Sequence, residues 1–153
     1  MADTKFSIHS ISIHNDLHEI PRVGQMIESF VAEYGLPASL ASAFTLASDE
    51  LLVNVISYGY DDQQEHNIYL QINCDASALV LRLEDDGRAY NPFSAPIPDL
   101  TVELIDRPVG GLGIHLVRQL MDQVEYDREA NKNIVRLTKQ IPPQKGKTTN
   151  DMY

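Results

Sequence analysis

Apolar residues recur every three or four positions through two consecutive stretches of the first 60 residues, which is the spacing of an amphipathic helix. The first stretch carries Ile20, Val23, Ile27, Phe30, Val31 and Tyr34. The second, from about residue 37 to residue 57, carries Leu40, Phe44, Ala47, Leu51, Val55 and Tyr58. Gly35 favours the end of the first helix, and Pro37 favours the start of the second. The pattern therefore predicts two helices joined by a short turn.

Alternation of apolar and polar residues predicts strands on both sides of these helices. Residues 6–13 alternate apart from one slip at Ser10 and Ile11, which predicts a strand with a bulge or bend at that point. Two later pairs of alternating stretches predict hairpins, residues 67–73 with 78–84 and residues 123–129 with 133–138.

A long segment without a regular pattern separates the two hairpins. Residues 91–109 contain four prolines and no clear period, so they predict a loop, and loops of this length are usually functional. Gly110-Gly111-Leu112-Gly113 then opens a third helix. Its apolar positions are Ile114, Val117, Leu120 and Met121. Residues 142–153 are rich in Pro, Lys and Thr, and we expect a flexible tail there after a single domain over residues 1–141.

Composition narrows the class of protein and of partner. A chain of 153 residues with 43% hydrophobic residues suits one domain with a sizeable core. The net charge of −10 argues against binding to nucleic acid or to an anionic membrane surface, but it permits a protein partner or a small ligand. No apolar run approaches the ~20 residues that span a bilayer. The first residues lack the pattern of a secretory signal, so we expect a cytoplasmic protein.

The single cysteine, Cys74, rules out an internal disulfide framework and a cysteine-rich zinc site. Chemistry must therefore come from other residues. Glu50 and Asn54 lie four positions apart on the second predicted helix, so they share one of its faces. A carboxylate and an amide oxygen so placed can orient a water and complete the shell of Mg²⁺. Two solvated polar residues on a helix are the alternative.

Two glycine-containing stretches follow the helices. Asp85-Asp86-Gly87 stands where a strand gives way to a loop, and a carboxylate fixed there can accept a hydrogen bond from an amine such as the 6-amino group of adenine. The glycines at 110–113 precede a helix, where backbone N–H groups and the helix dipole favour phosphate. A plain acidic turn and a plain glycine turn are the alternatives. The spacing fits neither a P-loop nor a Rossmann fingerprint.

The order of these elements is more specific than any one of them. A helix with Glu50 and Asn54, a strand ending at Asp85, a long loop and a glycine turn into a helix follow one another. In this order the chain resembles the GHKL (Bergerat-fold) ATPases, and more narrowly the stand-alone RsbW-like family of anti-sigma factors and serine-protein kinases. The resemblance covers nearly all of residues 5–140.

The resemblance implies a role for each matched residue. Ser48 to Asn54 matches the family's N box, which implies that Glu50 is the general base and that Asn54 binds Mg²⁺. Asp85 to Arg88 matches the first glycine box, which implies that Asp85 reads adenine and that Gly87 forms the turn.

The second glycine box extends from Arg107 to Ile114. It implies that Gly110, Gly111, Leu112 and Gly113 wrap the phosphates of ATP or ADP. Arg107 beside them would offset phosphate charge, and residues 94–109 would form the lid.

Some positions depart from the family pattern. Ala89 replaces the second glycine of the first box, and Tyr58 stands where many relatives have His. Relatives often supply a Thr to the adenine pocket from the last strand, where this chain offers Asn133 or, further along, Thr138.

The resemblance also implies a fold and a function. The fold is α+β, a two-layer sandwich whose mixed, mostly antiparallel sheet is covered on one face by about three helices. The function is Mg²⁺-dependent transfer of phosphate from ATP to a Ser or Thr of an anti-sigma factor antagonist (STAS) protein, by a homodimer that also sequesters a regulator such as a sigma factor. One alternative is a non-catalytic module that switches partners between ATP and ADP. An unrelated metabolic enzyme, which would fail to bind Mg-ATP, is another.

Overall fold

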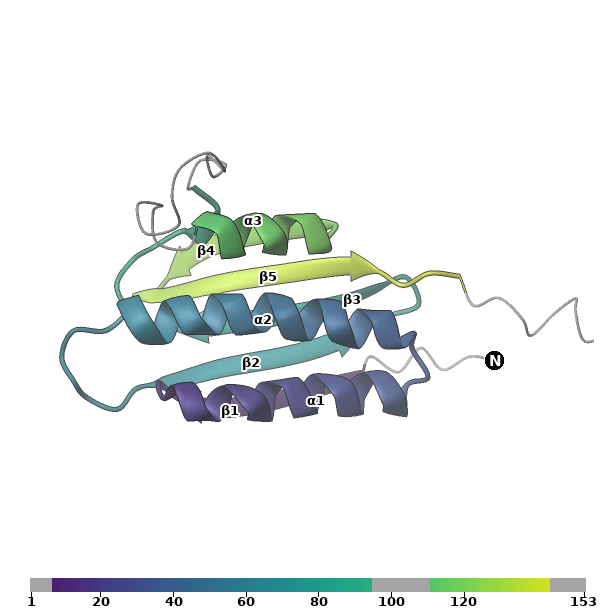
Figure 1. Cartoon of the computed structure of the whole chain (residues 1–153), viewed down its shortest axis with the longest axis horizontal. Helices are drawn as coiled ribbons and strands as arrows, with labels where there is room; N and C mark the ends of the chain where they lie inside the picture. Colours follow the sequence, from purple (N-terminus) through teal and green to yellow (C-terminus); the bar gives the residue numbers. More distant parts are fainter. Residues whose placement is uncertain (1–6, 95–110, 144–153) are drawn as a thin grey trace, which may run out of the picture.

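The chain forms an open sheet with helices along one face, as the computed structural model shows for residues 7–94 and 111–143 (Figure 1). The elements are β1 (Ser7–His14), α1 (Ile20–Glu33), α2 (Ala38–Tyr58), β2 (Asn67–Cys74), β3 (Ala78–Asp85), α3 (Gly111–Leu120), β4 (Gln123–Glu129) and β5 (Lys132–Gln140). Two short 3₁₀ turns, Leu17–Glu19 and Pro92–Ser94, complete the described part of the chain.

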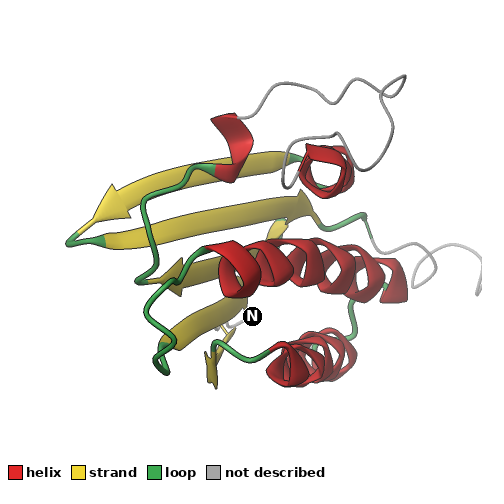
Figure 2. Ribbon diagram, turned by 60° about the vertical axis from the view of Figure 1, so that its left-hand side comes forward, coloured by secondary structure: helices red, strands yellow, loops and turns green. Residues whose placement is uncertain are grey.

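The sheet has five strands in the order β1-β2-β3-β5-β4, and each neighbouring pair among the described strands is antiparallel. The three helices lie on the same face of the sheet (Figures 1 and 2). The predicted α+β two-layer fold is therefore confirmed, with a wholly antiparallel described sheet in place of a mixed one. β5, the last of the described strands, lies between β3 and β4.

The core lies between the sheet and the helices. On β3 every second residue is buried, so Leu79, Leu81 and Leu83 form an apolar row that faces the helices. The fourth member of this row is Asp85, a buried carboxylate at the end of an otherwise apolar face. One polar residue therefore points into the helical layer where the strand ends.

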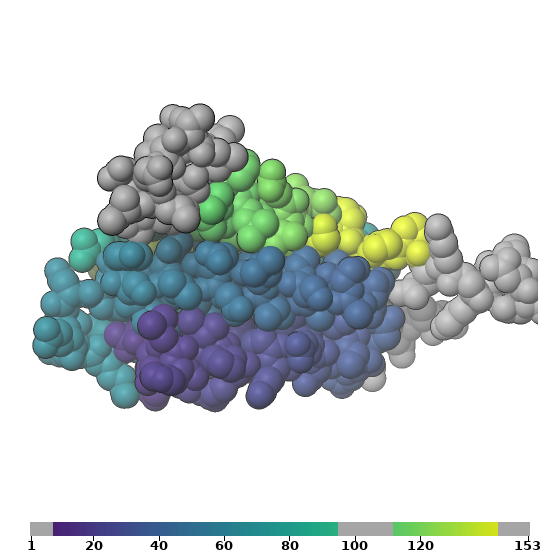
Figure 3. Space-filling model, viewed as in Figure 1, coloured from purple at the N-terminus to yellow at the C-terminus, as the bar shows by residue number. Residues whose placement is uncertain are grey.

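α2 lies between α1 and α3 and packs against both (Figures 1 and 3). It alone among the described helices is long and apolar enough to cross a membrane, contrary to the expectation that no apolar run has this length. Its buried positions are Leu40, Ala43, Phe44, Ala47, Ser48, Leu51 and Leu52. This burial explains why α2 is so apolar, because a helix in the core of a domain packs apolar side chains against its neighbours.

The predicted bulge in the first strand is wrong. β1 pairs with β2 in one uninterrupted register from Ser7 to His14. The apparent slip arises because Ile8 points away from the helices and is 52% exposed, while His9 takes the inward position. The His9 ring packs edge-on against Phe30 with centroids 5.2 Å apart. A histidine in an aromatic contact therefore disturbed the alternation, and the backbone remains regular.

Two residues with left-handed backbone form the turn between β4 and β5. Ala130 has a φ of 51° and Asn131 a φ of 62°, as in the type I′ turns that suit two-residue hairpin loops. Asn tolerates this region, but an alanine there is strained by its Cβ. This turn matters for the site because it sets the register between Arg128 and Asn133.

Replacing Ala130 by Gly is expected to raise the free energy of unfolding by about 0.5–1 kcal/mol, because glycine adopts positive φ without strain. Urea denaturation followed by circular dichroism measures the change. Ala32→Gly on the exposed side of α1 is the matched control, and it should lower stability by about 1 kcal/mol. A loss of stability in both variants would contradict the strain at Ala130.

Candidate functional site

A cavity of about 310 Å³ opens between the second half of α2 and the neighbouring strands β3 and β5. It is lined by Leu51, Asn54, Val55, Tyr58, Gly59, Leu83, Asp85, Arg88, Tyr90, Pro92, Asn133 and Val135. Its walls are mostly aliphatic and aromatic, with a few polar groups among them. This combination is typical of pockets that bind a small molecule and orient it through a few hydrogen bonds.

Asp85 is the buried carboxylate of this cavity, with only 4% of its surface exposed. Its Oδ1 accepts hydrogen bonds from the Gly87 N–H at 2.9 Å and from the Asn133 amide at 3.0 Å. Burial raises the pKa of the Asp85 carboxyl, and these two hydrogen bonds oppose that rise. Among the described residues no donor reaches Oδ2, so this oxygen can accept a hydrogen bond from a ligand.

Gly87 is needed for close approach of two backbone segments. Its backbone is not left-handed, because Gly35 is the one glycine with positive φ in the described chain. A Cβ at Gly87 would lie 2.8 Å from the carbonyl oxygen of Gly59, just after α2. The same carbonyl accepts the Arg88 N–H at 2.9 Å. The loop after β3 is therefore locked against the end of α2.

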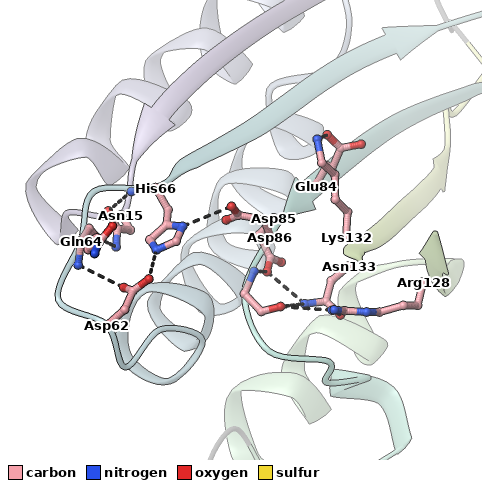
Figure 4. A network of polar contacts seen from close by, with 11 residues as sticks. Asn15, Asp62, Gln64, His66, Glu84, Asp85, Asp86, Arg128, Lys132 and Asn133 are labelled. Carbon is pink, nitrogen blue, oxygen red and sulfur yellow. Dashed lines mark hydrogen bonds and ion pairs between the residues drawn. The ribbon is translucent and has the colours of Figure 1, made fainter. Parts of the chain in front are cut away.

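Asn133 lies directly opposite Asp85 in the pairing of β3 with β5. Its side-chain nitrogen donates to Asp85 Oδ1 and, at 2.9 Å, to the carbonyl of Arg88. Thr138, the other residue considered for this place, pairs with Val80 further along the strand. Of these two residues, Asn133 lines the cavity and contacts Asp85 directly (Figure 4).

Asn54 and Glu50 differ in their surroundings although they share a face of α2. Asn54 lines the cavity, and its side-chain nitrogen is buried without a hydrogen-bond partner in the described structure. Glu50 stands one turn earlier, against the start of α3. A Cβ at Gly113 would overlap the Glu50 carboxylate, since it would lie 3.0 Å from its Cδ. Glycine at 113 therefore lets α3 begin beside this carboxylate.

Residues of the second glycine stretch are described only in part. α3 begins at Gly111, Leu112 is largely exposed, and Gly113 contacts Glu50. Arg107 and Gly110 lie outside the described residues, as does the expected lid apart from Ser94.

Comparison with known proteins decides the family. A family model described as a histidine kinase-like ATPase domain matches residues 13–139, which is most of the chain. The chain belongs to this family. Within the GHKL superfamily it is RsbW-like, as the resemblance implied.

Two curated relatives are similar over most of their length. A serine/threonine-protein kinase, BtrW of Bordetella bronchiseptica, is 32% identical over 107 residues, covering 70% of this chain and 75% of the relative. The anti-sigma F factor of Bacillus subtilis is 20% identical over 120 residues, covering 78% of this chain and 82% of the relative.

A solved structure of the RsbU and RsbW domains of Rv1364c from Mycobacterium tuberculosis has a TM-score of 0.61 and 14% identity. It matches 90% of this chain, which corresponds to 33% of that longer chain. At this identity the match shows the shared fold alone.

Membership of an ATPase family implies ATP or ADP as the ligand of this domain. The cavity suits such a ligand, because it offers aliphatic walls beside a buried carboxylate with one available oxygen. The unpartnered Asn54 amide also fits a cation, since rotation of the amide presents its oxygen to the cavity. The described residues contain no cluster of three His, Cys, Asp or Glu that could hold a metal. Mg²⁺ does not need such a cluster, because it is usually bound by one or two protein groups together with phosphate oxygens of the substrate and water.

His66 braces the ATPase domain beside the Asp85 loop. Its ring lies between Asp62, at 2.7 Å from Nε2, and Asp86, at 3.1 Å from Nδ1 (Figure 4). The ring also stacks on Tyr60, with centroids 4.3 Å apart. The hydrogen bonds to Asp86 and Asp62 raise the pKa of His66. This cluster joins the segment after α2 to the residue beside Asp85, and the sequence pattern did not predict these contacts.

His66→Gln is expected to cost up to about 1 kcal/mol of stability at pH 6 and less at pH 8. Because the pKa of His66 is raised above 6.5, its contribution is complete below 6.5 and is lost as pH rises through the higher folded value. Thermal unfolding at both pH values measures the difference. His18→Gln is the control, because His18 also contacts a carboxylate, Asp16 at 3.0 Å, but its side chain is 97% exposed and such a pair contributes little to stability. An equal loss at both pH values would show that packing, not charge, is what His66 contributes.

Proposed function

We propose that this chain is an ATP-dependent protein serine/threonine kinase of the anti-sigma-factor type. It phosphorylates a STAS-type antagonist and sequesters a regulator such as a sigma factor. The names of the two curated relatives, one a kinase and one an anti-sigma factor, support this assignment. The observation that carries it is the contact of the Glu50 carboxylate with Gly113, because it brings a candidate base to the amino-terminal turn of α3.

In this proposal the chain first binds and orients the nucleotide. Asp85 accepts a hydrogen bond from the 6-amino group of adenine, and the aliphatic walls of the cavity exclude water from the base. Asn54 would hold Mg²⁺, which supplies charge neutralisation and alignment at the phosphates. Backbone N–H groups at the start of α3, Gly111 and Gly113 among them, bind phosphate oxygens.

Glu50 then acts as the general base. It accepts the proton of a Ser or Thr hydroxyl as that oxygen forms a bond to the γ-phosphorus and the bond from phosphorus to the bridging oxygen of ADP breaks. Catalysis of this kind consists mainly of positioning and electrostatic stabilisation. The products are a phosphorylated partner and ADP.

A direct transfer assay tests this function. The purified chain is incubated with γ-labelled ATP, Mg²⁺ and STAS proteins encoded near its gene. Acid-stable label on a Ser or Thr of one STAS protein, absent with Glu50→Ala, supports the kinase. ATP binding without transfer to any partner supports the second candidate, a module that exchanges partners between ATP and ADP. Failure to bind Mg-ATP would exclude both.

The regulated partner and the assembly state belong to the same proposal. The relative named anti-sigma F factor supports a sigma factor as the sequestered regulator. We also propose a homodimer in the cytoplasm. Sedimentation of the chain alone, with a STAS protein and with a sigma factor measures both properties, and a monomer at all concentrations would argue against the dimer.

A further inference from the structure

Three side chains form a row across neighbouring strands at the end of the cavity where Asp85 lies. Asp85 on β3 is the pairing partner of Asn133 on β5, and Asn133 is the pairing partner of Arg128 on β4. Directly paired residues on antiparallel strands project from the same face of a sheet. The row therefore runs from the buried carboxylate, through the amide, to the guanidinium (Figure 4).

The side-chain amide of Asn133 is occupied by protein partners at both ends. Its nitrogen donates to Asp85 Oδ1 and to the Arg88 carbonyl, which uses its two hydrogens. Its oxygen accepts from Arg128 at 3.0 Å, from the Tyr126 hydroxyl, and from the Tyr90 N–H at 3.3 Å. With 5% of its surface exposed, Asn133 has no spare hydrogen for a base. It therefore acts on the ligand through Asp85.

Arg128 fixes the same loop from its other side. One guanidinium nitrogen donates both to Asn133 Oδ1 and, at 3.1 Å, to the carbonyl of Gly87. The bond to Asn133 orients the amide so that its nitrogen faces Asp85. The bond to Gly87 holds the turn whose N–H also donates to Asp85 Oδ1. Arg128, two strands away from Asp85, thus positions both groups that donate hydrogen bonds to the Asp85 carboxylate.

We propose that Asn133 and Arg128 are positioning residues that determine base specificity, because they hold Asp85 with Oδ1 occupied and Oδ2 directed to an amino group. This rests on the proposed nucleotide function. Adenine donates its 6-amino group to such an oxygen. Hypoxanthine and guanine present a carbonyl oxygen at the same place, which a fixed carboxylate repels. A loosened Asp85 can turn away or take up a proton, and it then discriminates poorly.

The test compares ADP with inosine diphosphate, which differs at position 6 of the base by an oxygen in place of the amino group. Binding of each is measured by titration calorimetry with the full chain. The wild-type protein should prefer ADP at least tenfold, as expected for one hydrogen bond to a charged group. In Asn133→Asp, which keeps the size of the side chain but replaces its donor by an oxygen, this preference should fall at least threefold. In Arg128→Gln it should fall about twofold to fivefold.

Matched controls carry the same substitutions on the opposite face of the sheet. Asn73→Asp on β2 and Arg136→Gln on β5 lie in the rows that alternate with the helix-facing ones, and both should keep the wild-type preference. Tyr126→Phe removes one hydroxyl from Asn133 and keeps the ring, so it should fold and lose part of the preference.

The readout separates positioning from general damage. A structural role alone would weaken both nucleotides equally and leave their ratio unchanged, which would overturn the inference while leaving the nucleotide function intact. An unchanged ratio in all three site variants would overturn it likewise. If the wild-type protein binds neither nucleotide, the proposed function itself fails.

Discussion

A protein in which Glu50 is replaced by Gln is expected to bind ATP within about threefold of wild type but to transfer phosphate at least ~100-fold more slowly. A general base contributes about 10²–10⁴-fold to the rate of a proton-dependent step, whereas the amide cannot accept the hydroxyl proton. The side chain keeps its size, so its contact with Gly113 is retained. Single-turnover transfer of label from ATP to a STAS protein measures the rate, and calorimetry measures affinity.

Asp49→Asn is the control for the loss of charge at Glu50. Asp49 is the preceding residue of α2, and it lines a separate groove between α1 and α2 instead of the cavity. Burial and the neighbouring Glu50 raise the pKa of Asp49. Both carboxylates are half-buried, so the control removes a charge of comparable burial from the same helix. It should retain transfer. Wild-type rates in the Glu50 variant would remove Glu50 from the chemistry and favour the non-catalytic module.

Asp85→Asn is expected to lower the affinity for ADP by about 100-fold. The variant loses a charged acceptor, and one end of its amide carries hydrogens that oppose the adenine amino group. A hydrogen bond to a charged group contributes about 1.5–3 kcal/mol, and 1.4 kcal/mol corresponds to tenfold in affinity. Calorimetric titration with ADP measures the loss, with Asp122→Asn, after α3, as a control. Affinity within threefold of wild type would contradict a role for Asp85 in reading the base.

Asp85→Asn should be at least as stable as wild type at pH 7. Its loss of affinity for ADP can therefore be distinguished from a failure to fold. Burial raises the folded pKa of Asp85 above its ordinary value of 3.8. A carboxyl whose pKa is raised by folding stabilises the folded state fully below its unfolded pKa of 3.8. This contribution is lost as pH rises through the folded pKa. Wild type should therefore gain stability relative to the variant as pH falls from 7 towards 4. Urea denaturation across this range measures the difference.

Local patterns predicted the parts of the site that lie on single elements. The four-residue spacing of Glu50 and Asn54 predicted that they share a face of α2, and alternation along β3 predicted a strand that ends near Asp85. The helices, hairpins and fold class followed from the same periodicities and from the family resemblance. These features depend on neighbours within a few residues of one another.

The parts that could not be predicted depend on strand register and on close contacts. Nothing in the local sequence pairs Asp85 with Asn133, 48 positions later, and only the family resemblance offered Asn133 for the adenine pocket. Neither predicted Arg128 from the next strand. The reason for glycine at 87 is likewise a contact with Gly59, which only the folded chain reveals. The roles of Glu50, Asn54, Arg107 and Gly110 remain predictions.

The place of β5 in the sheet has a consequence for protein synthesis. β5 is the last of the described strands to be made, yet it lies between β3 and β4, so a nascent chain without residues 132–140 has open edges on both. Such a chain also lacks Asn133, and Asp85 would have lost one of its two donors. We expect the domain to acquire affinity for nucleotide only after β5 has emerged from the ribosome. Until then the open strands are candidates for contact with chaperones.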